Sequence, residues 1–244
     1  MLVLSVMLFF LAFQAWPQAT DKEDRNFRIP LIGEKAPSFT AESTNGTLTF
    51  PDDFRGKWTI LVSHPQDFTP VCSSELLEFA HMQDDFDKAN ARLIVISTDP
   101  LESHLQWKKA LEGIFYEGKP TPKIQFPLVD DDALVISKEY GMIHPATNST
   151  KDVRGVFIID PDNTIRSVQF YPMEVGRNSE EILRTVKALQ ATASRKYLAP
   201  ADWDTGKDLL IATPPVTDQR TENVPDGFYK LSWFMWYERS KPSK

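Results

Sequence analysis

The 244-residue sequence contains a single cysteine, Cys72, so no disulfide can form within the chain. It also lacks the CxxC and HExxH patterns and has only four histidines, which leaves a zinc site of the usual spacing without support. No GxGxxG, GxxxxGKS/T or GxSxG pattern is present, so the readiest signs of a dinucleotide enzyme, a P-loop protein or a serine hydrolase are missing. We therefore expect neither a metal nor a bound cofactor.

Composition places the chain among ordinary globular proteins, because 41% of its residues are hydrophobic and 25% are charged. Its length fits one large domain, or one domain with an appendage. The formal net charge of -7 argues against nucleic-acid binding, which needs a basic surface.

Residues 1–19 differ from the rest of the chain, since they are apolar to about Trp16 and a charged stretch, TDKEDRN, begins at Thr20. The apolar run is shorter than the ~20 residues that span a bilayer. We expect a secretory signal peptide over residues 1–19, and hence a secreted or secretory-pathway protein without a stable membrane span. An uncleaved anchor is the alternative. Sequons at Asn45 and Asn148 would be glycosylation sites on an exported chain.

Beyond this leader, apolar periodicity alternates between strands and helices. It predicts strands over 58–64, 91–98 and 124–131, and helices over 70–88, 101–115 and 133–141. Residues 155–171, GVFIIDPDNTIRSVQFY, predict two strands around a turn, and Asn178 with Glu181 forms a capping box that starts a last helix. Strands that alternate with helices and then form a hairpin indicate an α/β fold with a mixed sheet.

The tail from about Leu198 is rich in proline and turn residues and carries two apolar, strand-like pieces. We assign residues 29–196 to the main domain and residues 197–244 to a small C-terminal subdomain. The aromatic cluster FYKLSWFMWY, residues 228–237, is too large to leave in water. We expect it to pack on the main domain or on another subunit.

Cys72 lies in SHPQDFTPVCSSELLEF, residues 63–79, after the first predicted strand. Thr69 suits a helix N-cap and Pro70 suits the first helical position, which places Cys72 in the first turn. Amide groups there have no partner within the helix, and the positive end of the helix dipole favours a thiolate. These amides and the Thr69 hydroxyl could donate to a peroxide oxygen. Spacing alone leaves a second interpretation open, in which Cys72 is a small apolar core residue.

The string PQDFTPVCSSE resembles the PxxxTxxC motif of the peroxiredoxins, and SHPQDFTPVCSSEL is similar to the one-cysteine class of that family. The similarity continues in order through LIVISTDPLESHLQWKK, VRGVFIIDPDNTIRSVQFYPMEVGRNSEEILRTVKALQ and PADWDTGKDLLIATPP, and it covers about residues 29–237. The resemblance implies a thioredoxin-like fold, with a central mixed sheet flanked by helices and a small C-terminal arm.

The same resemblance implies roles for four residues. Cys72 would be the peroxidatic nucleophile, Thr69 would hydrogen-bond the peroxide, and Pro65 would shield the thiolate from water. Arg154 matches the arginine that stabilises the thiolate and the transition state. Without the family, a surface charge at the start of a strand would be the better interpretation of Arg154.

Three further residues match supporting positions, each with a second interpretation. His64 would tune the thiolate or pack below its strand. Glu75 would orient an arginine or favour the first helical turn. Arg177 matches a second arginine of the class or is simply a charge before the capping box.

The implied activity is a thiol-dependent peroxidase that reduces hydrogen peroxide and organic or lipid hydroperoxides, in antioxidant defence and redox homeostasis. The cysteine becomes a sulfenic acid, which an external thiol must reduce because the chain has no second cysteine. Glutathione is the expected reductant at the level of the family. The class also implies a homodimer formed through the C-terminal arm. Most members are intracellular, so a cytoplasmic location follows if the leader is not functional.

The alternative function is a secreted, non-enzymatic chaperone-like or signalling protein that keeps the peroxiredoxin fold. The complete set of catalytic positions argues against it. A thioredoxin-like disulfide exchanger is a further alternative, which the missing CxxC opposes.

Overall fold

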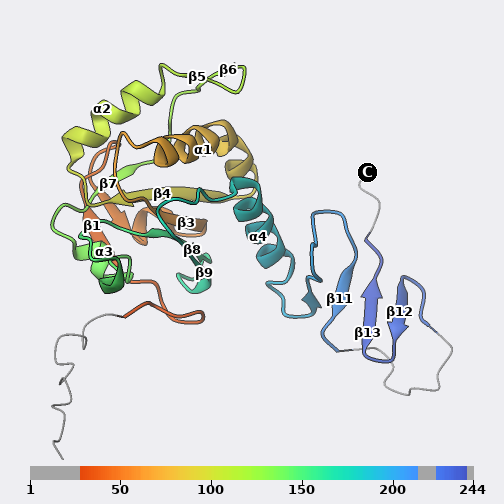
Figure 1. Cartoon of the computed structure of the whole chain (residues 1–244). Coiled ribbons are helices and arrows are strands. Elements are labelled where there is room, and N and C mark those ends of the chain that lie inside the picture. The colour runs from red at the N-terminus through yellow and green to blue at the C-terminus, as the bar shows by residue number, and fades with distance from the viewer. Residues whose placement is uncertain (1–27, 214–223, 241–244) are drawn as a thin grey trace, which may run out of the picture.

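The computed structural model describes residues 28–213 and 224–240, so the predicted signal peptide over residues 1–19 lies outside the described residues. A five-stranded sheet forms the centre of the structure, in the order β7-β4-β3-β8-β9 (Figure 1). Its strands are β3 (Trp58–Ser63), β4 (Ala91–Ser97), β7 (Leu128–Asp130), β8 (Arg154–Ile159) and β9 (Ile165–Tyr171). The pairs β3–β4 and β4–β7 are parallel, whereas β3–β8 and β8–β9 are antiparallel. This arrangement confirms the predicted mixed sheet.

Helices cover both faces of this sheet, because successive strand side chains point to opposite sides. Ile60 packs in one apolar cluster with side chains of α1 (Pro70–Lys88) and α4 (Ser179–Ala191). Its neighbour Leu61 packs in the other cluster, with side chains from β2 (Leu48–Phe50) and α3 (Val135–Glu139). In Figure 1, α1 and α3 accordingly lie on opposite sides of the sheet. The short strand β1 (Phe39–Ala41) pairs with β2.

Two predicted elements are shorter than the sequence indicated. The helix expected over residues 101–115 is α2 (Leu101–Leu111), and the chain then forms the small hairpin of β5 (Phe115–Tyr116) and β6 (Lys119–Pro120). Gly118 allows this hairpin turn, since its φ of 76° is in the left-handed region. The strand expected over residues 124–131 is reduced to β7, which begins only after a proline that has no amide hydrogen to donate.

The last helix, α4, begins as predicted, because the Asn178 side chain accepts from the Glu181 amide at 2.9 Å. The second half of the predicted capping box does not form there. The Glu181 carboxylate instead accepts from the Arg184 guanidinium at 2.5 and 2.8 Å.

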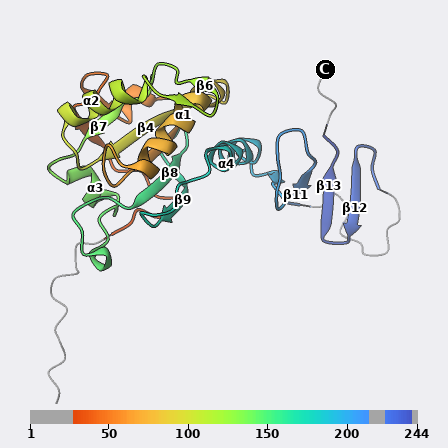
Figure 2. The same ribbon diagram turned by 45° about the horizontal axis from the view of Figure 1, so that its top comes forward.

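Beyond α4 the chain forms its own antiparallel sheet, in the order β10-β11-β13-β12. Its strands are β10 (Tyr197–Leu198), β11 (Leu209–Ile211), β12 (Phe228–Ser232) and β13 (Met235–Glu238), two more than the sequence indicated. Figures 1 and 2 show this sheet beyond the end of α4 and apart from the central sheet. The structure thus has the expected C-terminal subdomain, and the boundary between residues 196 and 197 stays a prediction.

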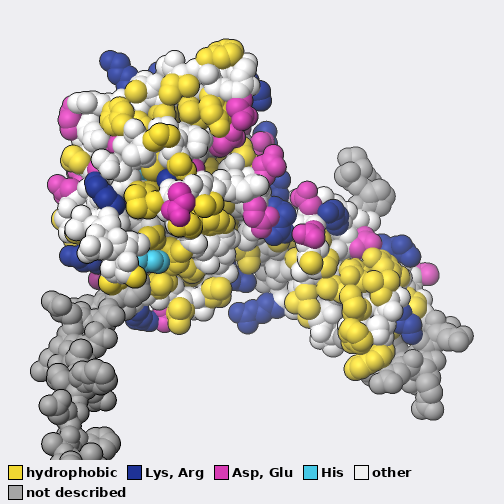
Figure 3. All heavy atoms as spheres, viewed as in Figure 1, with side chains coloured by type: hydrophobic (Ala, Val, Ile, Leu, Met, Phe, Trp, Pro, Cys, Tyr) yellow, Lys and Arg dark blue, Asp and Glu magenta, His cyan; other side chains and the backbone are white. Residues whose placement is uncertain are grey.

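The aromatic cluster of residues 228–237 lies in the hairpin formed by β12 and β13. Trp236 is 1% exposed, whereas Trp233 and Phe234 at the turn are 53% and 61% exposed. Hydrophobic side chains gather over this sheet on the face seen in Figure 3. The prediction that the cluster packs on the main domain is therefore wrong for Trp233 and Phe234, which are exposed on the separate C-terminal sheet. Among the helices of residues 28–213 and 224–240, none is long and apolar enough to cross a membrane.

Candidate active site

The loop between β3 and α1 starts the helix that carries the cysteine. Thr69 occupies the N-cap, with φ of -99° and ψ of 148°, and Pro70 takes the first helical position, as predicted. The Thr69 hydroxyl does not cap the helix but donates to the Gln66 carbonyl at 2.8 Å. Because a hydroxyl has one hydrogen, Thr69 offers a ligand its lone pairs in this arrangement. This differs from the donor role that the sequence suggested.

Cys72 lies in the first turn of α1 and is 0% exposed, within the apolar cluster between the sheet and the helices. Its sulfur also accepts a hydrogen bond from Nη1 of Arg154 at 3.3 Å. The core and site interpretations of Cys72 therefore describe the same position. Within the helix, the first amide with a carbonyl partner is that of Ser73, which donates to Thr69. Earlier amides have no intrahelical acceptor.

Strand pairing brings Arg154 to the cysteine, although 82 positions separate them. Arg154 is the first residue of β8, which runs antiparallel to β3 and so begins beside the end of that strand. Its side chain is buried, and its Nε and Nη2 donate to the Met173 carbonyl at 2.9 and 2.6 Å. The surface-charge interpretation of Arg154 is therefore wrong.

Glu75 joins Arg154 to Arg177. It lies on α1 one turn after Cys72, and its Oε2 accepts from both guanidinium groups at 2.7 Å. Its Oε1 accepts from the amide and Nε of Arg177 at 2.7 and 2.8 Å. Burial alone would raise the pKa of Glu75, but the charge and hydrogen bonds of Arg177, together with the charge of Arg154, lower it. Glu75 is therefore an anion that orients both arginines.

Arg177 also links this network to the sheet, because its Nη1 donates to the carbonyls of Ser63 and Gly155 at 2.8 and 2.7 Å. Its interpretation as a simple charge before a capping box is wrong. Around the sulfur, two guanidinium groups face one carboxylate, and all three side chains are at most 3% exposed. The site therefore carries an excess of one positive charge, in surroundings where water screens little.

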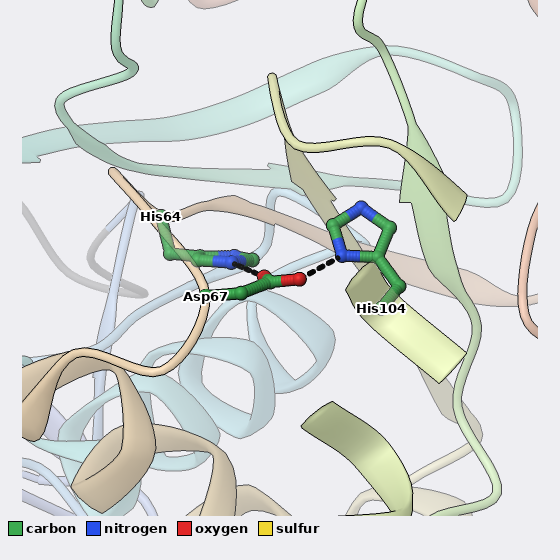
Figure 4. Close-up of side chains that lie close together, drawn as sticks. All are labelled: His64, Asp67 and His104. Atoms are coloured by element: carbon green, nitrogen blue, oxygen red, sulfur yellow. Dashed lines mark hydrogen bonds and ion pairs between the residues drawn. The ribbon is translucent and has the colours of Figure 1, made fainter. Parts of the chain in front are cut away.

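His64 belongs to a second network, with Asp67 and His104 (Figure 4). Its Nε2 lies 2.8 Å from one oxygen of Asp67, and Nδ1 of His104 lies 2.8 Å from the other. Burial lowers the pKa of His64, so its neutral ring donates through Nε2, and its Nδ1 has no hydrogen-bond partner. Pro65, which follows His64 in the chain, is buried.

Sequence reasoning missed Asp67 and His104, which lie 37 positions apart. Among the described residues, they form with His64 the group of histidine and carboxylate side chains close enough to hold a metal ion. Both nitrogens of His104 face acceptors, Asp67 and the Val129 carbonyl, and Nε2 of His64 faces Asp67. Hydrogen bonds thus occupy the positions that a metal would need.

A buried thiol that accepts from an arginine at a helix start, beside a thioredoxin-like sheet, defines a thiol-dependent redox site. A family model described as the AhpC/TSA family matches residues 32–168, more than half of the chain. A peroxiredoxin of Methanosarcina mazei is 46% identical over 211 residues, which are 85% of this chain and 96% of that protein. A peroxiredoxin of Thermotoga maritima is 42% identical over 217 residues, 87% of this chain and 98% of that protein.

Two solved structures are similar over their whole length. A yeast mitochondrial one-cysteine peroxiredoxin matches with a TM-score of 0.74 and 31% identity, over 87% of this chain and 100% of that chain. A mutant of peroxiredoxin 6 from Arenicola marina matches with a TM-score of 0.75 and 31% identity, over 88% of this chain and 100% of that chain. The chain therefore belongs to the AhpC/TSA family, as a peroxiredoxin of the one-cysteine class.

The protein is thus a thiol peroxidase, whose single cysteine cycles through a sulfenic acid and is reduced by an external thiol. The comparisons do not support the non-enzymatic chaperone-like or signalling alternative. They also give predicted export no support, and the cytoplasmic alternative agrees with the relatives found.

Proposed function

We propose that Cys72 is the peroxidatic nucleophile and that Arg154 is its principal partner. The observation that carries this proposal is the 3.3 Å hydrogen bond from Nη1 of Arg154 to the sulfur. The excess positive charge of the two arginines over Glu75 is balanced when the sulfur is a thiolate. The thiolate is the nucleophilic form of a cysteine, and its charge would face these guanidinium groups.

In the reaction, the thiolate attacks one peroxide oxygen and the O–O bond breaks. The sulfur is oxidised to a sulfenic acid, and the departing oxygen takes a proton and leaves as water or an alcohol. Arg154 and the amides of the first turn of α1 donate hydrogen bonds to the oxygens on which negative charge develops. Thr69 accepts a hydrogen bond from the peroxide, since its own hydrogen is held by Gln66. Pro65, buried beside His64, keeps water from the thiolate.

Glu75 and Arg177 act through Arg154 rather than on the peroxide. Arg177 holds Glu75 by three hydrogen bonds of 2.7 to 2.8 Å, and Glu75 in turn holds Nη1 of Arg154 at 2.7 Å. His64 lies outside this group and supports the loop through Asp67.

An external thiol completes the cycle. One thiol attacks the sulfenic sulfur, which releases water and leaves a mixed disulfide, and a second thiol then restores the Cys72 thiol. We propose glutathione as this reductant. The yeast mitochondrial relative, whose thiol is resolved through glutathione and thioredoxin systems, supports this choice.

We propose that a second copy of the chain covers the exposed aromatic turn of the C-terminal sheet. Trp233 and Phe234 are large apolar side chains that are more than half exposed, beside Leu231, which is 67% exposed. Burial of such a patch in a symmetric dimer would remove it from water. Light scattering on the purified protein tests this, since a monomer at micromolar concentration would contradict it.

The predicted leader needs a separate test, because residues 1–19 lie outside the described residues. Mass spectrometry of the mature protein decides between the two locations. A chain that begins near residue 20 agrees with export, whereas a cytoplasmic chain that keeps the leader agrees with the alternative.

The peroxidase proposal is tested by single-turnover oxidation of the reduced protein with equimolar hydrogen peroxide. Trp107 supplies a fluorescence signal, since its ring lies 5.0 Å from the His64 ring and 6.4 Å from the Phe68 ring, both in the loop between β3 and α1. Cys72→Ser is the control. We expect rapid peroxide consumption by the wild type alone, and equal consumption by both proteins would refute the role of Cys72.

A further inference from the structure

We propose that Asp67 is a positioning residue of the peroxidase site, whose carboxylate holds the backbone turn from which Thr69 and α1 start. This inference rests on the proposed role of Cys72. It concerns the buried network of Figure 4, to which the proposed chemistry assigns no step.

The Asp67 carboxylate gathers donors from two separate parts of the fold. Oδ1 faces Nε2 of His64, at the end of β3, at 2.8 Å. Oδ2 accepts from the Ser103 hydroxyl and faces Nδ1 of His104, both on α2 and both at 2.8 Å. The Asp67 amide also donates to the Asp99 carboxylate at 2.7 Å. One loop residue is thus tied to a central strand, to α2 and to the segment before it.

This attachment is electrostatic as well as geometric. Both ring nitrogens of His104 lie within hydrogen-bond distance of oxygens, Nδ1 of the Asp67 carboxylate at 2.8 Å and Nε2 of the Val129 carbonyl at 3.1 Å. Burial alone would raise the pKa of Asp67, but hydrogen bonds from His104 and His64 lower it strongly. Asp67 is therefore an anion, and charge-assisted bonds of this kind are short and directional.

The residue after Asp67 explains why the loop needs such an attachment. Phe68 has φ of 56°, a left-handed conformation that a bulky side chain rarely adopts, and its ring is 56% exposed. Burial of the ring therefore does not compensate for the strain. The turn is fixed on one side by Asp67 and on the other by the bond from the Thr69 hydroxyl to the Gln66 carbonyl. Such strain persists only where the surroundings determine the backbone.

The turn at Phe68 sets the direction in which α1 leaves the loop. Thr69 follows at once as the N-cap, and Cys72 lies three residues further on. A change in this turn would therefore move the Thr69 oxygen relative to the sulfur and to Arg154. Displacement of reacting groups by about 1 Å can cost about 100-fold in rate.

The variant Asp67→Asn tests the carboxylate with almost no change in volume. An asparagine presents an NH2 group where the carboxylate presents an oxygen, so it faces at least one of the three donors with a donor. Asp131→Asn is the matched control. Asp131 is equally buried, and its carboxylate accepts from three amides at the start of α3, at 2.7 to 3.0 Å, none of which belongs to the loop between β3 and α1.

Two rate constants of Cys72 are measured for each protein, oxidation by hydrogen peroxide and alkylation by iodoacetamide. Alkylation needs an accessible thiolate but no oriented peroxide, so the ratio of the two constants reports positioning. Partial unfolding would expose the buried thiol to iodoacetamide and would also lower the ratio, so the ratio is interpreted only for variants that circular dichroism shows to be folded. We expect Asp67→Asn to lower the ratio by about 100-fold. For Asp131→Asn we expect a loss of thermal stability with a ratio within about threefold of the wild type, since its contacts stabilise α3 alone.

Ser103→Ala, which removes one of the three donors, provides a milder variant if Asp67→Asn does not fold. A ratio lower by about tenfold is expected, from the loss of one hydrogen bond to a charged group. If Asp67→Asn folds, an unchanged ratio in that variant would overturn the proposal. If it does not fold, an unchanged ratio in Ser103→Ala would do so. So would stoichiometric metal in the purified wild type, since the three side chains would then be ligands. Failure of the proposed function is distinguishable, because the wild type itself would then consume no more peroxide than Cys72→Ser.

Discussion

Replacement of Glu75 by glutamine removes the carboxylate that two buried arginines share. The side chains of Glu75, Arg154 and Arg177 are 2%, 3% and 0% exposed, so water cannot take over its role. Glutamine keeps the shape and one oxygen, but its NH2 group meets a guanidinium that is itself a donor. We expect Glu75→Gln to be strongly destabilised and almost inactive.

The magnitude follows from the burial of the network. Removal of one partner from a buried ion pair typically costs about 3–5 kcal/mol, because it leaves an uncompensated charge. Here one carboxylate accepts four hydrogen bonds from two arginines, so we expect the upper half of that range, about 4–5 kcal/mol. For a chain of this size, that loss lowers the Tm by about 8–20 °C.

The pH dependence of this difference has a definite sign. The folded pKa of Glu75 lies below its ordinary value of 4.5, so the carboxylate binds protons less readily in the folded state than in the unfolded one. Its contribution to stability is therefore fully present above about pH 4.5 and is lost as the pH falls through the lower, folded pKa. The difference in free energy of unfolding between the wild type and Glu75→Gln should therefore narrow only in acid, below about pH 4.5.

Urea unfolding at pH 7, followed by circular dichroism, measures the free energy of unfolding, and peroxide consumption is measured on the same samples. Glu180→Gln is the control, since Glu180 is an exposed carboxylate in the first turn of α4. A loss below about 1 kcal/mol in Glu75→Gln, no larger than that typical of an exposed charge, would refute the reasoning.

Three further outcomes are expected. Arg154→Lys should lower the peroxide rate constant by about 100- to 1,000-fold in stopped-flow assays, because lysine cannot reach the sulfur, Glu75 and the Met173 carbonyl together. Burial raises the pKa of Asp152 to about 8 from 3.8, so its ionisation should destabilise the fold as the pH rises through that interval. In urea unfolding, the free energy of unfolding of Asp152→Asn should equal that of the wild type near pH 4 and should exceed it by up to about 5 kcal/mol at pH 8.5. Trp233→Glu should convert the dimer to a monomer in analytical ultracentrifugation, because it places a charge in the proposed apolar dimer contact.

Features that depend on neighbours in the chain could be predicted from the sequence. The apolar spacing of α1 is local, and the residues at its three- and four-residue steps, Cys72, Leu76, Phe79, Gln83 and Phe86, are all buried. The N-cap at Thr69 is local too. The end of α2 was missed because apolar residues continue past Leu111, where a short hairpin replaces the helix.

The site depends on contacts that spacing does not encode. Arg154 reaches the sulfur because β8 pairs with β3, and only the family resemblance indicated that pairing of distant segments. Asp67 and His104 carried no signal, since single aspartates and histidines are common on surfaces. Their role appears only when α2 is packed beside the end of β3.

The single cysteine gives the positive charge of the site two opposite consequences. The guanidinium groups stabilise the negative charge that develops on a peroxide as it reacts at the sulfur, and they do so equally when a second peroxide converts the sulfenic acid to sulfinic acid. A chain with a second cysteine could remove the sulfenic acid at once, whereas here it persists until an external thiol arrives. The remaining protection is access, because the Cys72 side chain is fully buried and any reagent needs a shift of its neighbours.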